Sequence, residues 1–360
     1  MYQRKDGIWI EKINVPGQGQ KTFSGKTQRI VKQKIAEWKV EGEKGNTFAQ
    51  AADAWDSWHS AQVSYNAHDV YNPMLKRAKE HFKRNYIKDI TPDMVQGFIN
   101  SVAARGYAKG TVQKHLNMMR MIFDYAITQP GSGLYYNPCG AVRIPTGLST
   151  TRREPPTDEQ LAKVRPIPND DMGLFAYFLM YTGMRRGELL ALRWEDIDRE
   201  NKIIHVNKSV YYMGNNPHIK EPKTAAGKRD VDLLDVLADV LPKGGRGYVF
   251  GGEKPLTSSA FRKGWVRLCK ELGLVTVEEK KHYAEGNKHE YIEHIYTPTV
   301  TPHQFRHAFA SMLDDAGIDE SGAKAILGHS SIVVTKDIYT HLRERKRERI
   351  GNTLNEYLKK

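Results

Sequence analysis

The sequence predicts an α+β multi-domain protein: a small β-sheet-plus-helix N-terminal domain, an all-helical second domain, and a mainly helical third domain with a small β-sheet. The chain has 360 residues, whereas single domains usually have about 100–150. Its hydrophobic fraction of 39% is sufficient for folded cores, which argues against extensive disorder. The spacing of apolar residues changes along the chain from strand-like alternation to helical periodicity and then to a mixture of both.

The chain is basic, with 55 Lys and Arg residues against 42 Asp and Glu and a formal charge of +13. Residues 1–145 hold 21 basic and 12 acidic side chains, and so carry +9 of this charge. Such a concentration indicates a polyanion partner, because neutralising phosphates releases counterions. A surface that only confers solubility explains the charge equally well.

Membrane insertion and secretion are not expected. The longest mostly apolar stretch, residues 173–183, is shorter than the roughly 20 residues that span a bilayer. The first ten residues lack the apolar core of a signal peptide. Two cysteines, Cys139 and Cys269, cannot build a disulfide framework. We therefore expect a soluble, cytoplasmic protein without a membrane partner.

The first predicted domain comprises residues 1–45. Residues 7–13 and 21–23 have strand character, and a Pro-Gly turn separates them. The spacing then becomes helical, with an apolar stripe that consists of Ile30, Ile35 and Trp38. A unit this small buries little, so its basic side chains are expected at the surface, where a sheet face can enter a DNA major groove.

The second predicted domain comprises residues 46–145, which have helical patterns throughout. Three helix starts are marked by Thr47, by Thr91 followed by Pro92, and by Thr111. Met and aromatic residues recur here at helical spacing, which is typical of a core. Residues 146–156 are rich in Pro, Ser and Thr and break the periodicity, so we expect an interdomain linker there.

The third predicted domain comprises residues 157–360. Thr157 and Gln160 form a capping-box pattern, and the apolar residues 175–181 predict a buried helix. Short strands are expected at residues 202–210, 229–233 and 248–250.

Three segments of this domain carry residues suited to phosphate chemistry. In residues 182–192 a glycine turn precedes a helix with Arg185 at its N-terminal end, where free backbone N–H groups also attract anions. An ion pair between Arg185 and Glu188 is an equally good interpretation. In residues 301–310, Thr301-Pro302 starts a helix that places His303 and Arg306 on one face.

The third segment follows the helix that Gly328 is expected to end. It places His329 on the turn and Tyr339 ten residues later, on the next helix. A single tyrosine is usually a core or surface residue, but here two arginines and two histidines are available to neutralise a phosphate that it could attack.

Metal and nucleotide cofactors are not expected. His289 and His294 resemble a zinc motif, but histidines five residues apart on a helix cannot face the same metal ion. Neither cysteine belongs to a Cys-x-x-Cys pair, and the chain has no P-loop or dinucleotide-binding glycine motif.

Taken in order, these residues resemble the pattern Arg…Lys…His-x-x-Arg…His…Tyr of the tyrosine recombinases, specifically the phage and conjugative-element integrases. The resemblance implies that Tyr339 is the nucleophile and that Arg185 and Arg306 clamp the scissile phosphate. It further implies that His303 assists proton transfer and that His329 donates a hydrogen bond to a non-bridging oxygen.

The resemblance also implies a catalytic lysine on a β-hairpin. Lys223 is the best match, between the predicted strands, and Lys220 and Lys228 are close competitors. Glu188 matches an acidic position that supports the site. Residues 275–300 are longer than the family pattern requires and are expected to be an added strand pair or loop.

The implied function is site-specific DNA recombination, in which a mobile element or prophage is integrated and excised through a 3′-phosphotyrosyl intermediate, without ATP, metal or another cofactor. Residues 1–45 would be an arm-type DNA-binding domain, residues 46–145 a core-binding domain and residues 157–360 the catalytic domain. The implied partners are double-stranded DNA at attachment sites and further copies of the chain, as a tetramer on DNA, with an excisionase or a host DNA-bending protein as accessory factors in a bacterial host's cytoplasm.

Two alternatives remain from the sequence. A type IB topoisomerase-like enzyme would use the same chemistry for relaxation, and a non-catalytic DNA-binding regulator would need only the basic domains. The C-terminal helix, residues 343–360, has an apolar seam that fits packing on its own chain or on a neighbouring protomer.

Overall fold

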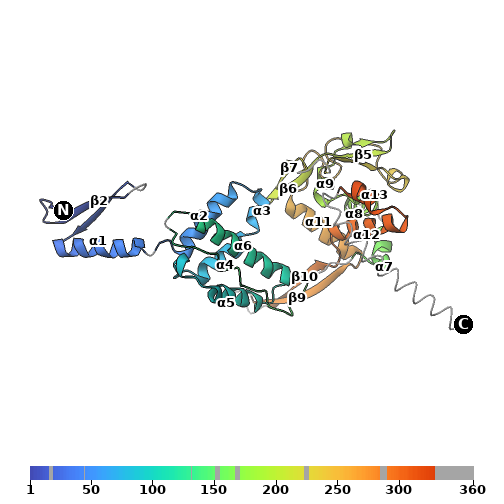
Figure 1. Ribbon diagram of the computed structural model, residues 1–360. Coiled ribbons are helices and arrows are strands. Elements are labelled where there is room, and N and C mark those ends of the chain that lie inside the picture. Colours follow the sequence, from blue (N-terminus) through green and yellow to red (C-terminus); the bar gives the residue numbers. More distant parts are fainter. Residues whose placement is uncertain are drawn as a thin grey trace. The chain divides into compact units, whose positions relative to one another are not determined.

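The chain divides into two units, Met1–Arg152 and Arg153–Lys360, in the computed structural model (Figure 1). The division falls within the stretch that the sequence predicts to be a linker. The described residues are 1–15, 19–43, 45–130, 132–150, 155–166, 171–222, 227–283 and 290–328.

The first unit begins with a three-stranded antiparallel sheet of order β1-β2-β3, formed by β1 (Tyr2–Gln3), β2 (Trp9–Val15) and β3 (Gly19–Gly25). Helix α1 (Gln28–Glu43) packs on β2 and β3 (Figure 1). Its apolar stripe differs by one residue from the prediction, because Val31 is fully buried and Ile30 is 38% exposed. Val31, Ile35 and Trp38 follow i, i+4 and i+7 spacing, and this face meets Phe23.

The rest of the first unit is helical: α2 (Phe48–Ser60), α3 (Tyr65–Asp69), α4 (Asn72–His81), α5 (Pro92–Ala103) and α6 (Lys109–Ile127). The predicted caps Thr47 and Thr91 accept hydrogen bonds from the first turns of α2 and α5. Helix α6 begins two residues before the predicted Thr111. The Met and aromatic residues form a core, as predicted, that includes Phe48, Trp55, Phe98, Met119 and Phe123.

Most of the described helices of the second unit contact α8 (Asp171–Thr182), in which almost every side chain is buried. The others are α7 (Asp158–Val164), α9 (Arg186–Ala191), α10 (Asp235–Ala238), α11 (Ser258–Glu271), α12 (Pro302–Asp315) and α13 (Glu320–Leu327). The predicted capping box of Thr157 and Gln160 starts α7. None of the described helices is long and apolar enough to cross a lipid bilayer.

In the described ranges of the second unit, the strands form three small antiparallel sheets. One has the order β4-β5-β8, with β4 (Ile197–Asp198), β5 (Ile203–Val206) and β8 (Arg229–Asp232). The others are the hairpin of β6 (Ser209–Met213) and β7 (Asn216–Lys220) and the hairpin of β9 (Val275–Tyr283) and β10 (Glu290–Pro298). The α+β class predicted from the sequence is confirmed, and residues 275–283 and 290–298 form a strand pair, one of the two forms expected for this segment.

Two strand predictions need correction. Residues 202–210 form two strands in different sheets, and the break lies at Asn207, whose side chain donates a hydrogen bond to Asp196 Oδ1 (3.1 Å). Residues 248–250 are not a strand, because Tyr248 makes only isolated bridges to Arg193 and Gly252.

Candidate active site

Gly183 connects the buried helix α8 to the start of α9. Its φ of +59° turns the chain sharply and leaves Arg185 as the N-cap of α9, as the sequence predicts. The Arg185 backbone N–H donates to Glu188 Oε2 (2.8 Å), and Arg185 Nη1 donates to Glu188 Oε1 (2.6 Å). The ion pair between Arg185 and Glu188, one of the two interpretations of the sequence, is therefore present. A phosphate contact by Arg185 stays a prediction.

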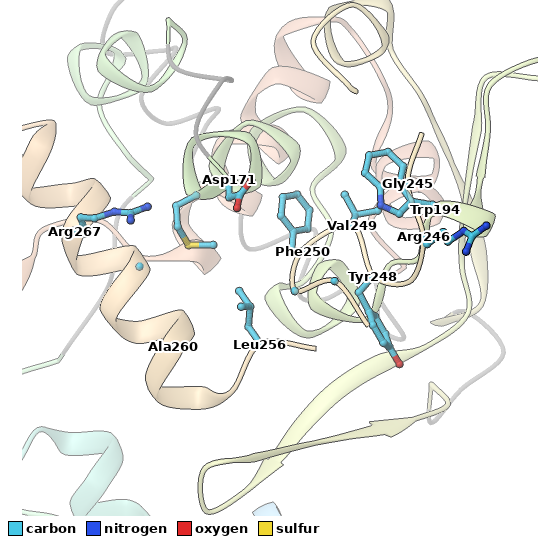
Figure 2. A pocket seen from close by; sticks show the side chains of 14 residues that line it. Asp171, Trp194, Gly245, Arg246, Tyr248, Val249, Phe250, Leu256, Ala260 and Arg267 are labelled. Carbon is cyan, nitrogen blue, oxygen red and sulfur yellow. The ribbon is translucent and has the colours of Figure 1, made fainter. Parts of the chain in front are cut away.

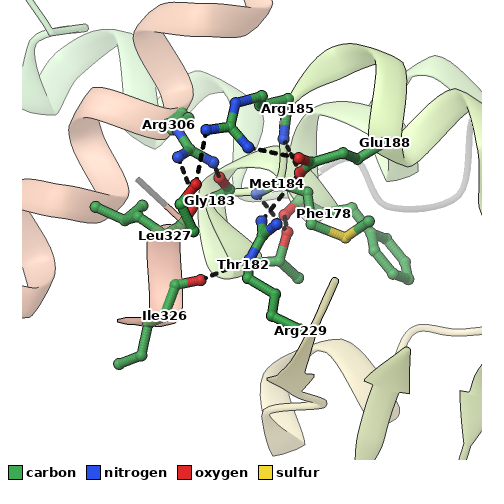
Figure 3. A network of polar contacts seen from close by, with 11 residues as sticks. Phe178, Thr182, Gly183, Met184, Arg185, Glu188, Arg229, Arg306, Ile326 and Leu327 are labelled. Carbon is green, nitrogen blue, oxygen red and sulfur yellow. Dashed lines mark hydrogen bonds and ion pairs between the residues drawn. The ribbon is translucent and has the colours of Figure 1, made fainter. Parts of the chain in front are cut away.

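Glu188 is the acidic centre of a group of three arginines, Arg185, Arg229 and Arg306, which together with Glu188 form the arginine cluster (Figure 3). Its side chain is only 4% exposed and also accepts a hydrogen bond from Arg229 Nη2 on β8 (2.9 Å). Burial would raise the pKa of Glu188, but the hydrogen bond and charge of Arg229, together with Arg185, outweigh it and hold the pKa below its usual range. Glu188 is thus a carboxylate at neutral pH.

Three arginines donate to the last carbonyl groups of α13 and its cap (Figure 3). Arg229 Nε bonds Ile326 O (2.9 Å), Arg306 Nη2 bonds Leu327 O, and Arg185 Nη2 bonds Gly328 O (2.9 Å). A helix C-terminus carries partial negative charge, so cations are favourable there. Gly328 has the left-handed conformation (φ +65°) and ends α13, as predicted.

Arg306 is buried at the centre of this arrangement and is only 3% exposed. Its Nη1 donates to Gly183 O (2.6 Å), so the side chain joins the end of α8 to the end of α13. Burial, with the positive charge of Arg185, lowers the pKa of Arg306 to about 9. The side chain remains a cation at neutral pH, and its contact with phosphate stays a prediction.

His303 and His307 lie on successive turns of α12. Thr301 begins this helix, and its backbone N–H donates to Gln304 Oε1 (2.8 Å). His303 is exposed, and its ring meets that of His307 edge-on with centroids 4.8 Å apart. Burial, with the positive charges of His303 and Arg306, lowers the pKa of His307 to about 4.

The low pKa of His307 predicts a pH-dependent stability. The unfolded imidazole binds a proton below about pH 6.5 and the folded one only below about pH 4, so the free energy of unfolding falls as the pH drops through this window. Between pH 7 and pH 5, we expect the free energy of unfolding of His307→Gln to fall by about 1 kcal/mol less than that of the wild type. This figure allows for solvent screening of the half-buried ring. Urea unfolding at both pH values measures this difference. Equal losses in the two proteins would contradict a buried, neutral His307.

The described structure brings together Arg185, Glu188 and Arg306, with His303 one turn before Arg306 on α12. The predicted site residues Lys223, His329 and Tyr339 lie outside the described residues.

The two lysines that compete with Lys223 have other contacts. Lys220 Nζ lies 5.4 Å from the centre of the Tyr211 ring, and Lys228 Nζ lies 2.9 Å from Glu221 Oε2.

Arg229 is the residue of the cluster that the sequence did not single out. It was predicted only as the start of a strand, and its contacts with Glu188 and Ile326 are between elements far apart in the sequence. Arg229 follows Lys228 and precedes Asp230, and these charged neighbours give no signal that its side chain is buried.

A separate pocket in this unit is lined by residues that include Trp194, Arg246, Tyr248, Phe250 and Arg267 (Figure 2). Its volume is about 460 Å³. None of the arginine-cluster residues lines it, so it does not enlarge the candidate site.

Two family profiles match the chain. The Phage integrase family profile matches residues 162–346, and the Phage integrase SAM-like domain profile matches residues 47–131. The first match covers more than half of the chain and includes the whole arginine cluster. The chain belongs to the phage integrase family. It is a site-specific tyrosine recombinase, an enzyme that breaks and rejoins DNA strands.

Two similar proteins are a recombinase and an integrase, as expected for this family. A tyrosine recombinase XerC-like protein of Caldanaerobacter subterraneus is 28% identical over 82% of this chain and 77% of its own length. The ICEBs1 integrase of Bacillus subtilis is 26% identical over 79% of this chain and 75% of its own length.

Solved structures of the same fold are also similar. The Tn1549 transposon integrase, in complex with a circular-intermediate DNA, has a TM-score of 0.65 at 20% identity. The matched region covers 85% of this chain and 99% of the Tn1549 integrase chain in that structure. A lambda integrase tetramer bound to a Holliday junction has a TM-score of 0.59 at 18% identity and covers 92% of this chain and 95% of its own.

Proposed function

We propose that this integrase cuts and rejoins double-stranded DNA at attachment sites through a 3′-phosphotyrosyl bond to Tyr339, and so integrates and excises a mobile element. The observation that carries the proposal is the convergence of Arg185 and Arg306 at the carbonyl end of α13, directly before His329 in the sequence. Two cations fixed at one place suit a phosphate whose negative charge increases during attack.

The reaction divides into cleavage and rejoining. The phenolate oxygen of Tyr339 attacks the scissile phosphorus, and the bond from phosphorus to the 5′-oxygen breaks. Lys223 donates the proton that the departing 5′-oxygen needs. His303 assists proton transfer, and His329 donates a hydrogen bond to a non-bridging oxygen of the phosphate. Attack by a 5′-hydroxyl of the partner duplex reverses these steps. The phosphotyrosyl bond retains the energy of the broken bond, so rejoining needs no ATP.

The rest of the chain would hold the DNA. In this proposal residues 1–45 bind arm-type sites and residues 46–145 bind the core site, and both parts carry excess positive charge. Four copies on two duplexes would supply the four cleavages of a complete exchange, and the similar lambda integrase has been solved as a tetramer bound to a Holliday junction. An excisionase or a host DNA-bending protein would set the direction, and the reaction would take place on DNA in the cytoplasm of a bacterial host.

A nicked suicide duplex that carries the element's attachment site tests the proposal. Cleavage releases a short fragment, so rejoining is prevented and the covalent complex accumulates. We expect a protein–DNA adduct that survives denaturation and partitions with protein on phenol extraction, with a free 5′-hydroxyl on the released strand. DNA binding without an adduct would contradict the proposal and indicate a regulator. Relaxation of supercoiled DNA without strand exchange between two sites would indicate a topoisomerase.

A further inference from the structure

Arg229 is a buried cation that the chemistry proposed above leaves without a role. It is the first residue of β8, and its side chain is 7% exposed. Nη2 bonds Glu188 Oε2 and Nε bonds Ile326 O, each at 2.9 Å (Figure 3). Its buried Nη1 has no hydrogen-bond partner within the described ranges. Burying a guanidinium group with an unpaired donor is costly, so a residue needed only for strand packing would be better replaced by an apolar one.

The contacts of Arg229 connect three elements that carry the site. Strand β8 follows the segment that contains Lys223, α9 carries Glu188 next to its N-cap Arg185, and α13 leads through Gly328 to His329. A displacement of the Arg229 guanidinium therefore affects the carboxylate that holds Arg185 and the helix end from which the chain continues to His329.

The ionisation of Glu188 depends strongly on Arg229. In the described part of the chain, the charged groups that face Glu188 are Arg185 at its own helix, Arg229 on β8 and Arg306 on α12. Only the first two bond it directly. Burial is the largest influence on the pKa of Glu188 and raises it, and Arg229 is the largest influence that lowers it. Without Arg229, Glu188 would take up a proton more readily and would lose its hold on Arg185.

We infer that Arg229 is a positioning residue of this recombinase: its bonds to Glu188 and to Ile326 O fix the Glu188 carboxylate and the end of α13, so that Arg185 is held ready for the scissile phosphate. The inference rests on the proposed phosphotyrosyl chemistry, because it assigns Arg229 an effect on cleavage. In this role Arg229 acts through Glu188 and α13 and not by a contact with DNA, in keeping with a side chain that is 7% exposed.

The test compares single-turnover cleavage of the nicked suicide duplex from pH 5.5 to pH 8.5. Arg229→Gln removes the charge, Arg229→Lys retains it, and Glu188→Gln/Arg229→Gln removes the carboxyl group that would titrate. Arg199→Gln is the matched control, since Arg199 also donates to carbonyls in this unit, those of Leu241 and Pro242, but lies outside the cluster. Circular dichroism checks folding, and a filter-binding assay measures DNA affinity.

We expect Arg229→Gln to cleave at least about 10-fold more slowly than the wild type at pH 7 and to recover with rising pH as Glu188 loses its proton. DNA affinity should change by less than about 3-fold, since no DNA contact is removed. Arg229→Lys should restore most of the rate and the wild-type pH profile. The double variant should be slow at every pH and lack the recovery, and Arg199→Gln should match the wild type.

Different failures point to different errors. If the wild type forms no adduct, the proposed function is overturned and this role with it. If the wild type forms the adduct and folded Arg229→Gln has the same rate and pH profile, only the role of Arg229 is overturned. If Arg229→Gln does not fold, the cleavage rate of Arg229→Lys decides. A rate near that of the wild type supports a role for the positive charge. A loss of rate that is as large at pH 8.5 as at pH 6 contradicts that role.

Discussion

The Tyr339→Phe variant is expected to form no covalent adduct with the nicked duplex while it binds DNA as tightly as the wild type. The substitution removes one oxygen atom, the atom that would form the bond to phosphorus, and no basic side chain. A phenol with a pKa near 10 is mostly protonated at neutral pH, so catalysis requires cations that favour the phenolate. Arg185 and Arg306 are the cations that the structure fixes near the start of the segment that leads to Tyr339.

Denaturing gel electrophoresis measures the adduct, and filter binding at fixed salt measures the affinity. Tyr296→Phe is a suitable control, because it removes the same oxygen atom from a tyrosine of β10 that lies outside the arginine cluster, and it should form the adduct at the wild-type rate. An adduct yield from Tyr339→Phe within about 10-fold of the wild type would refute Tyr339 as the nucleophile.

Helix starts were predictable because their signals are local. Thr47, Thr91 and Thr157 each stand directly before a helix, and each side-chain oxygen accepts a hydrogen bond from a backbone N–H three residues later. Such a contact is encoded within four consecutive residues, so tertiary packing does not need to be known. Gly183 and Gly328 were recognised at turns for the same reason, since both have positive φ values.

The contacts of the site were less predictable, because they join distant segments. Arg185 with Glu188 is a local pair and could be anticipated, whereas the bond from Arg229 to Glu188 depends on how β8 lies against α9. The carbonyl partners of Arg306 could not be read from the sequence either, since backbone oxygens have no residue-specific signal. Both arginines are buried, against the usual preference of charged residues for the surface.

Packing also decides details of periodicity. Ile30 and Val31 are adjacent at the edge of the stripe on α1, and the way the helix packs on β2 and β3 buries Val31 and leaves Ile30 38% exposed. The alternation of residues 202–210 continues through Asn207, so the pattern does not reveal that β5 and β6 belong to different sheets.

Gly183→Ala is expected to cause the largest loss of stability among single-methyl additions at the candidate site. An added Cβ would lie 2.4 Å from Phe309 Cδ1 and 2.9 Å from Leu327 Cδ2, and both side chains are buried. Such overpacking costs about 1–3 kcal/mol, and the φ of +59° adds about 1–2 kcal/mol for a residue with a Cβ. We therefore expect the unit that contains α8 and α12 to lose about 2–5 kcal/mol of unfolding free energy.

Gly317→Ala separates the two contributions. Gly317 also has a positive φ, +80°, in the same unit, but an added Cβ would meet nothing within 4 Å. Urea unfolding of both variants should therefore show a loss of about 1–2 kcal/mol for Gly317→Ala and a clearly larger loss for Gly183→Ala. Equal losses would mean that Phe309 and Leu327 move aside without cost. Since Gly183 O accepts a hydrogen bond from Arg306, the movement that relieves the clash in Gly183→Ala should also slow cleavage, whereas Gly317→Ala should cleave at the wild-type rate.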